Sequence, residues 1–212
     1  LLRDAADAYA VLRERFQELG YSPFLRRQGK NEVVMAQQGV ILPRPTQPWI
    51  NIALFVATFM ATRLPGAFNE WAQLAPTLDS FVQAILRQPT LLLKGLPFSL
   101  SLMSILLAHE MGHYLVGRRY NAPVSLPYFI PMPIVSLFGT MGAVIFQSSP
   151  FEDRRSLFDI GVAGPLAGLV VALPLLVFGL ATSQVRPIPP NALMEGNSIL
   201  YLAIKYLRFG QI

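Results

Sequence analysis

The sequence contains no cysteine, which excludes disulfide bonds and thiolate metal ligands. Charged side chains are also scarce, because Asp, Glu, Lys and Arg make up 14% of the 212 residues, against about 25% in ordinary soluble domains. Hydrophobic residues make up 53% of the chain, which favours a membrane protein. Any metal ion that the chain holds must therefore be bound by histidine and carboxylate side chains.

Three apolar segments are candidates for crossing a membrane. Residues 97–117 contain no Lys or Arg, and a helix of that length crosses a hydrocarbon layer of about 30 Å. A shorter candidate covers 49–62, with Trp49 and Arg63 as interfacial anchors at its two ends. A third covers 160–182. We therefore expect a mainly α-helical, multi-pass membrane protein with about three transmembrane helices.

The N-terminal part of the chain is more polar. Helical spacing of its apolar residues predicts an amphipathic helix over 1–19, which ends at Gly20. A short strand is expected at 33–36, after a loop that carries three basic residues (Arg26, Arg27 and Lys30). Together these predict a small soluble α+β cap over 1–44, followed by a membrane core over 45–212. The basic face of the cap suits lipid head groups better than nucleic acid, so we expect no nucleic-acid partner.

The remaining segments carry weaker signals. Residues 64–96 are expected to include a helix that lies at the membrane interface, whereas 191–212 are too mixed in character to assign. Within the third span, Gly164 and Gly168 form a GxxxG pair, whose usual meaning is close packing of helices rather than chemistry. Asp159 opens that span and is expected to cap it.

The basic residues indicate how the chain is oriented. With the N-terminus in the cytosol, seven basic residues precede the first span, and four more fall on the cytosolic side (Arg118, Arg119, Arg154 and Arg155). The opposite side receives four (Arg63, Arg87, Lys94 and Arg186). This excess agrees with the positive-inside rule, so we expect a cytosolic N-terminus.

The central apolar segment carries the motif His109-Glu110-Met111-Gly112-His113. An acidic residue near the centre of a membrane span costs roughly 2.5 kcal/mol or more, so a chain that keeps Glu110 there is expected to use it. Positions four apart share one face of a helix, which lets His109 and His113 direct their imidazoles at one ion. Zn²⁺ accepts neutral imidazole and makes its bound water acidic, and Glu110 is close enough to take that proton. The HExxH spacing also arises by chance, but the apolar setting favours a metal site.

Residues 121–150 contain no charged residue, yet four prolines forbid one continuous helix through them (Pro123, Pro127, Pro131 and Pro133). Irregular backbone at membrane depth is tolerated where protein covers it or where it lines a cavity. A turn is expected first, followed by a strand at 143–146 (the turn residues are Gly139, Thr140, Met141 and Gly142). We favour a re-entrant, β-hairpin-like loop whose open strand edge binds an unwound substrate peptide, with the turn residues in the substrate site. A packed re-entrant loop or an extra short span is the alternative.

These motifs, taken in order, resemble the site-2 protease family of intramembrane zinc metalloproteases, and most of all its cyanobacterial and plastid branch. The resemblance rests on the HExxH motif, the basic pair Arg118-Arg119, the proline-rich segment 127–133, the turn at 139–143 and the small-residue segment 161–168. It implies that His109 and His113 are zinc ligands and that Glu110 is the general base. It also implies that the protein, embedded in a plasma or thylakoid-type membrane, cleaves transmembrane segments of single-span proteins near the cytosolic face.

One part of the family pattern is missing. The family's third zinc ligand is the aspartate of an Asp-Gly motif on a later helix, and no Asp-Gly pair precedes Ile212. Asp159 is expected to be a cap, and Glu195 lies in a polar turn. Two protein ligands are too few for a typical catalytic zinc site. We therefore expect the chain to be a fragment that is inactive by itself, with the third ligand downstream of Ile212.

Three functions remain open at the level of sequence. The first is regulated intramembrane proteolysis by a zinc-dependent endopeptidase. The second is a membrane-bound zincin of another clan that attacks cytosolic or lipidated peptides, and the third is a protease-derived protein that binds membrane segments without cleaving them. The uncharged, proline-rich loop favours the first, because a soluble substrate needs no apolar approach. The intact Glu110 argues against the third.

Overall fold

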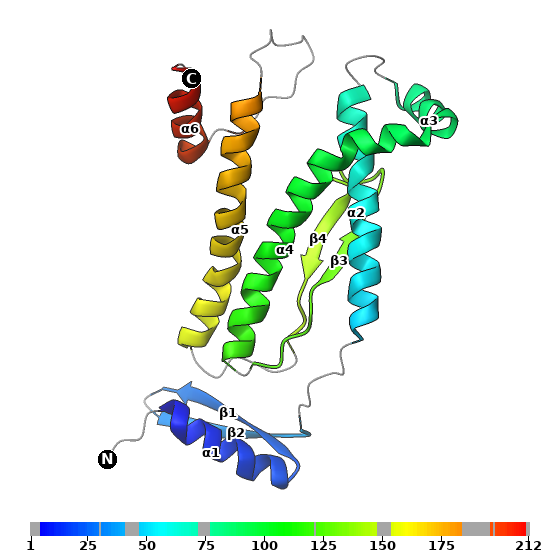
Figure 1. Cartoon of the computed structure of the whole chain (residues 1–212). Coiled ribbons are helices and arrows are strands. Elements are labelled where there is room, and N and C mark those ends of the chain that lie inside the picture. Colours follow the sequence, from blue (N-terminus) through cyan, green and yellow to red (C-terminus); the bar gives the residue numbers. More distant parts are fainter. Residues whose placement is uncertain are drawn as a thin grey trace.

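The computed structural model describes residues 5–29, 31–40, 47–71, 77–120, 122–147, 154–183, 196 and 198–210. Over these residues the chain is mainly helical, with two small antiparallel sheets (Figure 1). Three of the described helical segments are long and apolar enough to cross a membrane: Pro48–Asn69, Pro89–Arg119 and Arg155–Thr182. The expected fold class is thereby confirmed.

The N-terminal elements are helix α1 (Ala5–Glu18) and strands β1 (Tyr21–Gln28) and β2 (Asn31–Gln38). Helix α1 ends where expected, and Gly20 then adopts a φ of +79°, a conformation that favours glycine. The strands pair antiparallel from Tyr21 opposite Gln38 to Gln28 opposite Asn31. Strand β1 corrects one expectation, because the segment predicted as a basic loop is largely a strand that contains Arg26 and Arg27. Lys30 lies outside the described residues.

The first span, α2 (Pro48–Trp71), is ten residues longer than the 14 residues predicted over 49–62. Arg63 does not end it as an interfacial anchor. Instead, its Nε donates a hydrogen bond to the Leu92 carbonyl at 3.3 Å, which ties α2 to the 3₁₀ helix η1 (Pro89–Gly95). The helix also continues through Pro65, which lacks the N–H that would bond to the carbonyl four residues earlier.

The second and third spans agree more closely with the sequence. Helix α4 (Leu96–Arg119) contains the whole predicted span 97–117, and α5 (Arg154–Thr182) contains 160–182. Between α2 and η1 lies the short amphipathic helix α3 (Leu78–Arg87), in the segment where an interfacial helix was expected. Its Phe81 is buried, with its ring 5.2 Å from that of Phe68. A last helix, α6 (Ile199–Phe209), occupies part of the segment that could not be assigned.

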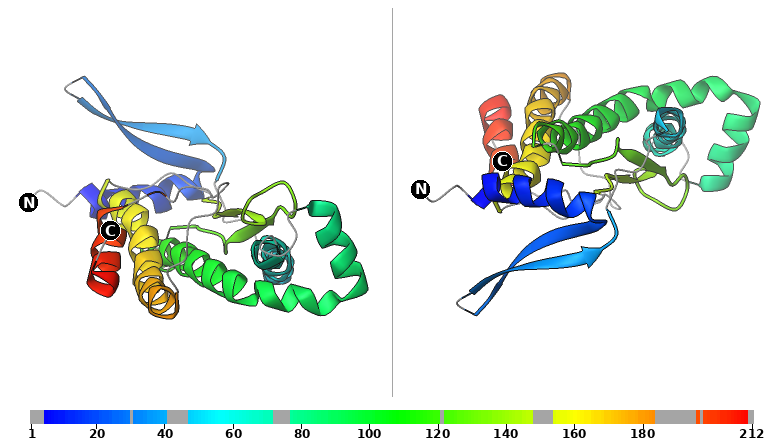
Figure 2. Two further views of the ribbon diagram at one scale, coloured as in Figure 1. Left: turned by 90° about the horizontal axis from the view of Figure 1, so that it is seen from above. Right: turned by 90° about the horizontal axis from the view of Figure 1, so that it is seen from below.

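The spans form an open row rather than a closed bundle. Helices α4 and α5 run antiparallel and side by side, and α2 lies on the other side of α4, with strands β3 (Tyr128–Pro131) and β4 (Thr140–Val144) between α2 and α4 (Figures 1 and 2). The N-terminal elements lie at the end where α4 finishes and α5 begins, and α3 lies at the opposite end (Figure 1). Among the described residues, Arg118 and Arg119 at the end of α4 therefore lie at one end of the row, and Arg87 at the end of α3 lies at the other.

The expected hairpin is present as β3 and β4, and it lies between α2 and α4, but its turn lies earlier in the chain than predicted. Tyr128 pairs with Val144 and Pro131 with Thr140, so Thr140 to Gly142 belong to a strand and the turn occupies 132–139. Gly139 has a φ of +77°, and a Cβ on it would lie 2.6 Å from the Ala61 carbonyl oxygen. That carbonyl is the one that Pro65 leaves without its helical partner. Contact with α2, which the local sequence does not reveal, thus decides where the turn ends.

Candidate metal centre

His109 and His113 lie on one face of α4, as their spacing predicts. Their Nε2 atoms are 3.2 Å apart, and the two rings meet edge to face with centroids 4.9 Å apart. Both side chains are half-buried, and they lie well inside the span, ten and six residues before its last residue, Arg119. Two imidazole nitrogens thus converge on one point within an apolar helix.

The separation of the two nitrogens fits a tetrahedral zinc ion. With Zn–N bonds of about 2.0–2.1 Å and a tetrahedral angle, two ligand nitrogens stand about 3.3 Å apart. The observed 3.2 Å is within that geometry, although one shared proton would also hold the nitrogens at this distance. The donor set and its spacing therefore suit zinc without rearrangement of α4.

Residues of helix α5 pack against both histidine side chains. The Nδ1–H of His113 donates to the Ile160 carbonyl at 2.6 Å. A Cβ on Gly164 would lie 2.5 Å from both Cδ2 and Cε1 of the His113 ring, so no larger residue fits there. A Cβ on Gly168 would lie 3.4 Å from Cβ and Nδ1 of His109, an ordinary contact.

The GxxxG pair was expected to serve close packing of helices rather than chemistry, and the packing is confirmed by the contacts of α5 with α4. Gly164 and Gly168 do let α5 approach α4 closely, but the side chains that they admit are the two candidate metal ligands. A signal for this was present in the sequence. The two glycines share the four-residue spacing of the two histidines, so a helix packed antiparallel against α4 can place one beside each ring.

Glu110 lies on a neighbouring face of α4. It follows His109 by one residue, which turns it about 100° round the helix axis. Its side chain is buried, at 7% exposure, and it lies two turns from Gly117, which packs against Val124 just before the hairpin. By helical phase, Glu110 therefore faces the same side of α4 as Gly117, toward the segment that leads into the hairpin.

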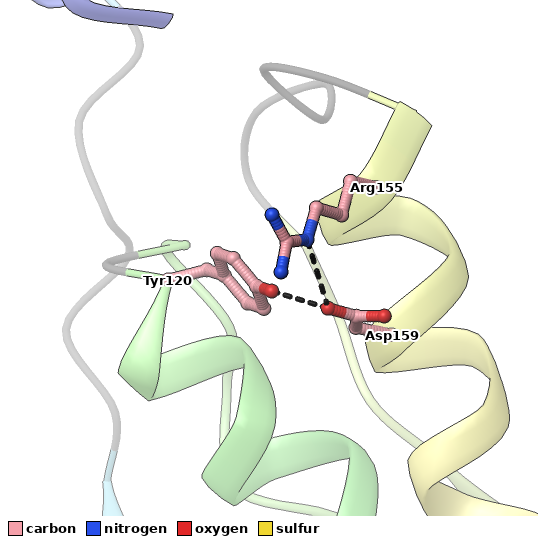
Figure 3. Close-up of polar contacts among 3 residues, drawn as sticks. All are labelled: Tyr120, Arg155 and Asp159. Carbon is pink, nitrogen blue, oxygen red and sulfur yellow. Dashed lines mark hydrogen bonds and ion pairs between the residues drawn. The ribbon is translucent and has the colours of Figure 1, made fainter.

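Asp159 is not the cap that the sequence predicts. Helix α5 begins five residues earlier, at Arg154, and Asp159 lies in its second turn. Its Oδ2 accepts a hydrogen bond from the Tyr120 hydroxyl and lies 3.9 Å from Nε of Arg155 (Figure 3). This carboxylate is thus engaged away from the histidines.

The third ligand is not found in the described part of the chain. Over those residues no group of three or more His, Cys, Asp or Glu side chains could hold a metal ion. Glu195, which was considered at the level of sequence, lies outside the described residues.

A groove lies between α4 and the hairpin, and the α4 residues that line it precede His109 by one to two turns. It encloses about 580 Å³ between α4 and the hairpin. The wall on α4 is Leu102 and Leu106, which share the face of His109 because they precede it by seven and three residues. The wall on the hairpin includes three of the four predicted substrate residues, Thr140, Met141 and Gly142. The fourth, Gly139, packs against α2 instead.

The hairpin is held to α2 at its base. The Asn51 side-chain amide donates hydrogen bonds to the carbonyls of Leu126, at 3.2 Å, and Pro127, at 2.9 Å. One turn further along α2, the Phe55 ring packs edge to face on Phe129, with centroids 5.1 Å apart. No local sequence pattern indicates Asn51, which holds the base of the hairpin from a distant helix.

The sequence pattern of Peptidase family M50 matches residues 97–208, which is more than half of the chain. The chain belongs to peptidase family M50. The M50 match covers nearly all of α4, the hairpin, α5 and most of α6, so every element that contributes to the histidine site lies within it. The resemblance drawn from the motifs is therefore confirmed at the level of the family.

The chain is similar to several plant proteins. A rice protein (Oryza sativa subsp. japonica) named "Probable zinc metalloprotease EGY1, chloroplastic" is 30% identical over 171 residues, which cover 75% of this chain and 29% of that protein. The Arabidopsis thaliana protein of the same name is 30% identical over 170 residues, 75% of this chain and 30% of that protein. An Arabidopsis thaliana protein named "Probable zinc metalloprotease EGY2, chloroplastic" is 31% identical over 117 residues, 55% of this chain and 20% of that protein.

The chain spans less than a third of the length of these curated relatives. No solved structure matches it. Its three apolar helices, together with its family, identify a membrane protein.

Proposed function

We propose that this chain forms the zinc-binding core of a metalloendopeptidase that cleaves transmembrane segments of other proteins within the bilayer. The observation that carries the proposal is the pair of Nε2 atoms of His109 and His113, 3.2 Å apart inside an apolar span and next to the buried Glu110. The names of the relatives, which describe zinc metalloproteases, support the choice of metal and of reaction.

The residues of the chain have distinct tasks in this reaction. His109 and His113 would hold zinc through their Nε2 atoms, and a bound zinc would supply an acidified water molecule and polarise the scissile carbonyl. The Glu110 carboxylate accepts a proton from that water and returns it to the nitrogen of the leaving amine. A third protein ligand is still required, and we expect a carboxylate, because the family resemblance implies an aspartate.

The groove supports an extended, apolar substrate. Strand β4 pairs with β3 on one side, and in the described part of the chain no strand pairs with its other edge. A transmembrane segment that unwinds locally can add to this edge through main-chain hydrogen bonds. Thr140, Met141 and Gly142 line the groove beside that edge, so they are proposed to contact the substrate. A single-span protein suits this site, because its one helix is not packed against other helices of its own chain and can approach the open edge.

The depth of the site favours cleavage near one membrane face. His113 precedes the end of α4 by six residues, or about 9 Å along the axis. The basic residues that follow the span, Arg118 and Arg119, favour the cytosol for that face and for the N-terminal elements. We propose a multi-pass protein of a plasma or thylakoid-type membrane, and the relatives named as chloroplastic favour the second.

The proposal is tested by reconstituting the natural full-length protein in liposomes with a single-span substrate and mapping the cleaved bond by mass spectrometry. We expect a cut within the apolar segment of the substrate, lost in Glu110→Gln while bound zinc is retained. Cleavage only in soluble flanking peptide would instead favour a zincin of another type. Retention of substrate without cleavage, unchanged by Glu110→Gln, would leave a protein that binds membrane segments.

A further inference from the structure

We propose that Tyr120 and Asp159 are a positioning pair, which sets α5 against α4 so that the Ile160 carbonyl orients the His113 ring for metal binding. The inference rests on the proposed zinc site. It assigns a role to two residues outside the HExxH motif, neither of which touches the metal or the substrate.

The first step of the argument is the bond between His113 and Ile160. A backbone carbonyl can only accept, so at 2.6 Å the Nδ1 atom of His113 must carry the proton. In the neutral ring this leaves Nε2 with a free lone pair, directed toward Nε2 of His109. The Ile160 carbonyl therefore selects the tautomer that can bind zinc through Nε2.

The second step is that this bond depends on the placement of α5. Ile160 is buried, at 6% exposure, and its carbonyl belongs to the α5 backbone, so it moves with the helix. One turn further on, Gly164 lies so close to the ring that no side chain fits between them. A small slide or rotation of α5 would either break the bond to Ile160 or drive the backbone into His113.

The third step is the link at the end of the two helices. Tyr120 caps the C-terminus of α4, with its N–H bonded to the Val116 carbonyl at 3.1 Å. Its hydroxyl reaches α5 and donates to Asp159, the residue directly before Ile160 (Figure 3). The hydrogen bonds from Tyr120 and His113 thus fasten α4 to adjacent residues of α5.

Arg155 offers a control within the same cluster. Its Nε lies 3.9 Å from Asp159, but its side chain is 87% exposed and it belongs to α5 itself. Arg155 therefore cannot hold α5 against α4, although it forms an ion pair with Asp159.

The deciding experiment reads the tautomer of His113 without metal. The chain contains two histidines, so ¹⁵N-histidine labelling in detergent micelles gives two ring spin systems, which one histidine variant assigns. At alkaline pH, where imidazoles are neutral, we expect His113 of the parent to carry its proton on Nδ1. Tyr120→Phe and Asp159→Ala should shift population to the Nε2–H form. Asp159→Asn, which keeps an acceptor for the tyrosine, and Arg155→Ala should retain the parent tautomer.

Cobalt binding supplies the second readout. We expect Tyr120→Phe and Asp159→Ala to weaken Co²⁺ binding by about 10–100-fold, the usual effect of losing a group that orients a ligand. The double variant should be no weaker than either single one, because both remove the same bond. Failure of the parent to bind Co²⁺ would overturn the proposed zinc site. The tautomer of His113 is measured without metal, so it would still test the positioning role of Tyr120 and Asp159. A His113 ring that stays Nδ1–H in Tyr120→Phe overturns the positioning role.

Discussion

Replacing Gly164 by alanine is expected to weaken metal binding while leaving the rest of the chain folded. The added methyl group would lie 2.5 Å from two carbons of the His113 ring, where ordinary contacts begin at 3.4 Å. The ring or α5 must therefore move by about 1 Å, whereas a metal ligand tolerates displacements of about 0.2 Å. Overpacking of this kind costs about 1–3 kcal/mol, and about 1.4 kcal/mol corresponds to tenfold in affinity. We expect Co²⁺ affinity to fall by about 5- to 140-fold.

Two other glycines of α5 supply matched controls. A Cβ on Gly161 meets nothing within 4 Å, and one on Gly168 meets His109 at 3.4 Å. All three substitutions exchange glycine for alanine in one helix, so they share the same gain in helix propensity. The expected order of Co²⁺ affinity is therefore Gly161→Ala, equal to the parent, then Gly168→Ala, slightly weaker, then Gly164→Ala.

The assay is titration of the purified protein in detergent with Co²⁺, followed by visible absorption, with circular dichroism as the check on folding. If Gly164→Ala binds Co²⁺ as tightly as Gly161→Ala, the contact between α5 and His113 does not shape the metal site. The assignment of the GxxxG pair to the site would then be wrong.

Three further predictions follow from the site and its supports. His109→Ala and His113→Ala should each reduce bound zinc, measured by atomic absorption after dialysis, and full retention by either variant would exclude that residue as a ligand. Asn51→Ala removes two hydrogen bonds to the base of the hairpin, each worth about 1 kcal/mol, so amide exchange in the hairpin should accelerate while Co²⁺ affinity stays at the parent value. Gly139→Ala should disturb the hairpin more than Gly142→Ala, because both have positive φ but Gly139 alone abuts the α2 backbone, and equal exchange rates in the two variants would contradict this.

Much of the helical architecture was predictable because its signals are local. An apolar run without charge predicts a span, and the structure contains all three predicted spans within longer helices. The ends of these helices were less predictable. Helix α2 passes Arg63 because that side chain bonds to Leu92 of η1, a contact that exists only after the chain folds back. The basic segment around Arg26 is a strand for a similar reason, since β2 supplies its hydrogen bonds.

The hairpin, too, was predictable where its signals are local and unpredictable where contacts with another helix decide. The prolines and glycines between α4 and α5 predicted an irregular, re-entrant loop with a turn and a strand. Its turn lies earlier than predicted because Gly139 is held against Ala61 of α2, which places Thr140 in a strand. Asn51, which fastens the hairpin base, lies 75 residues before its first acceptor, so no local pattern reveals the contact.

The sequence by itself determined which residues are the candidates for the metal site: the two histidines, together with the glutamate between them. Positions four apart on any α-helix share a face, so the two histidines can meet one ion. Helical geometry alone brings the imidazoles to one side of α4, whatever packs against them. Only the tertiary structure decided which nitrogen of His113 is free, since the Ile160 carbonyl and Gly164 come from another helix. It also decided that Asp159 faces Tyr120 rather than capping α5. Local periodicity sets which side chains can meet a metal, and packing between helices sets how their rings are held.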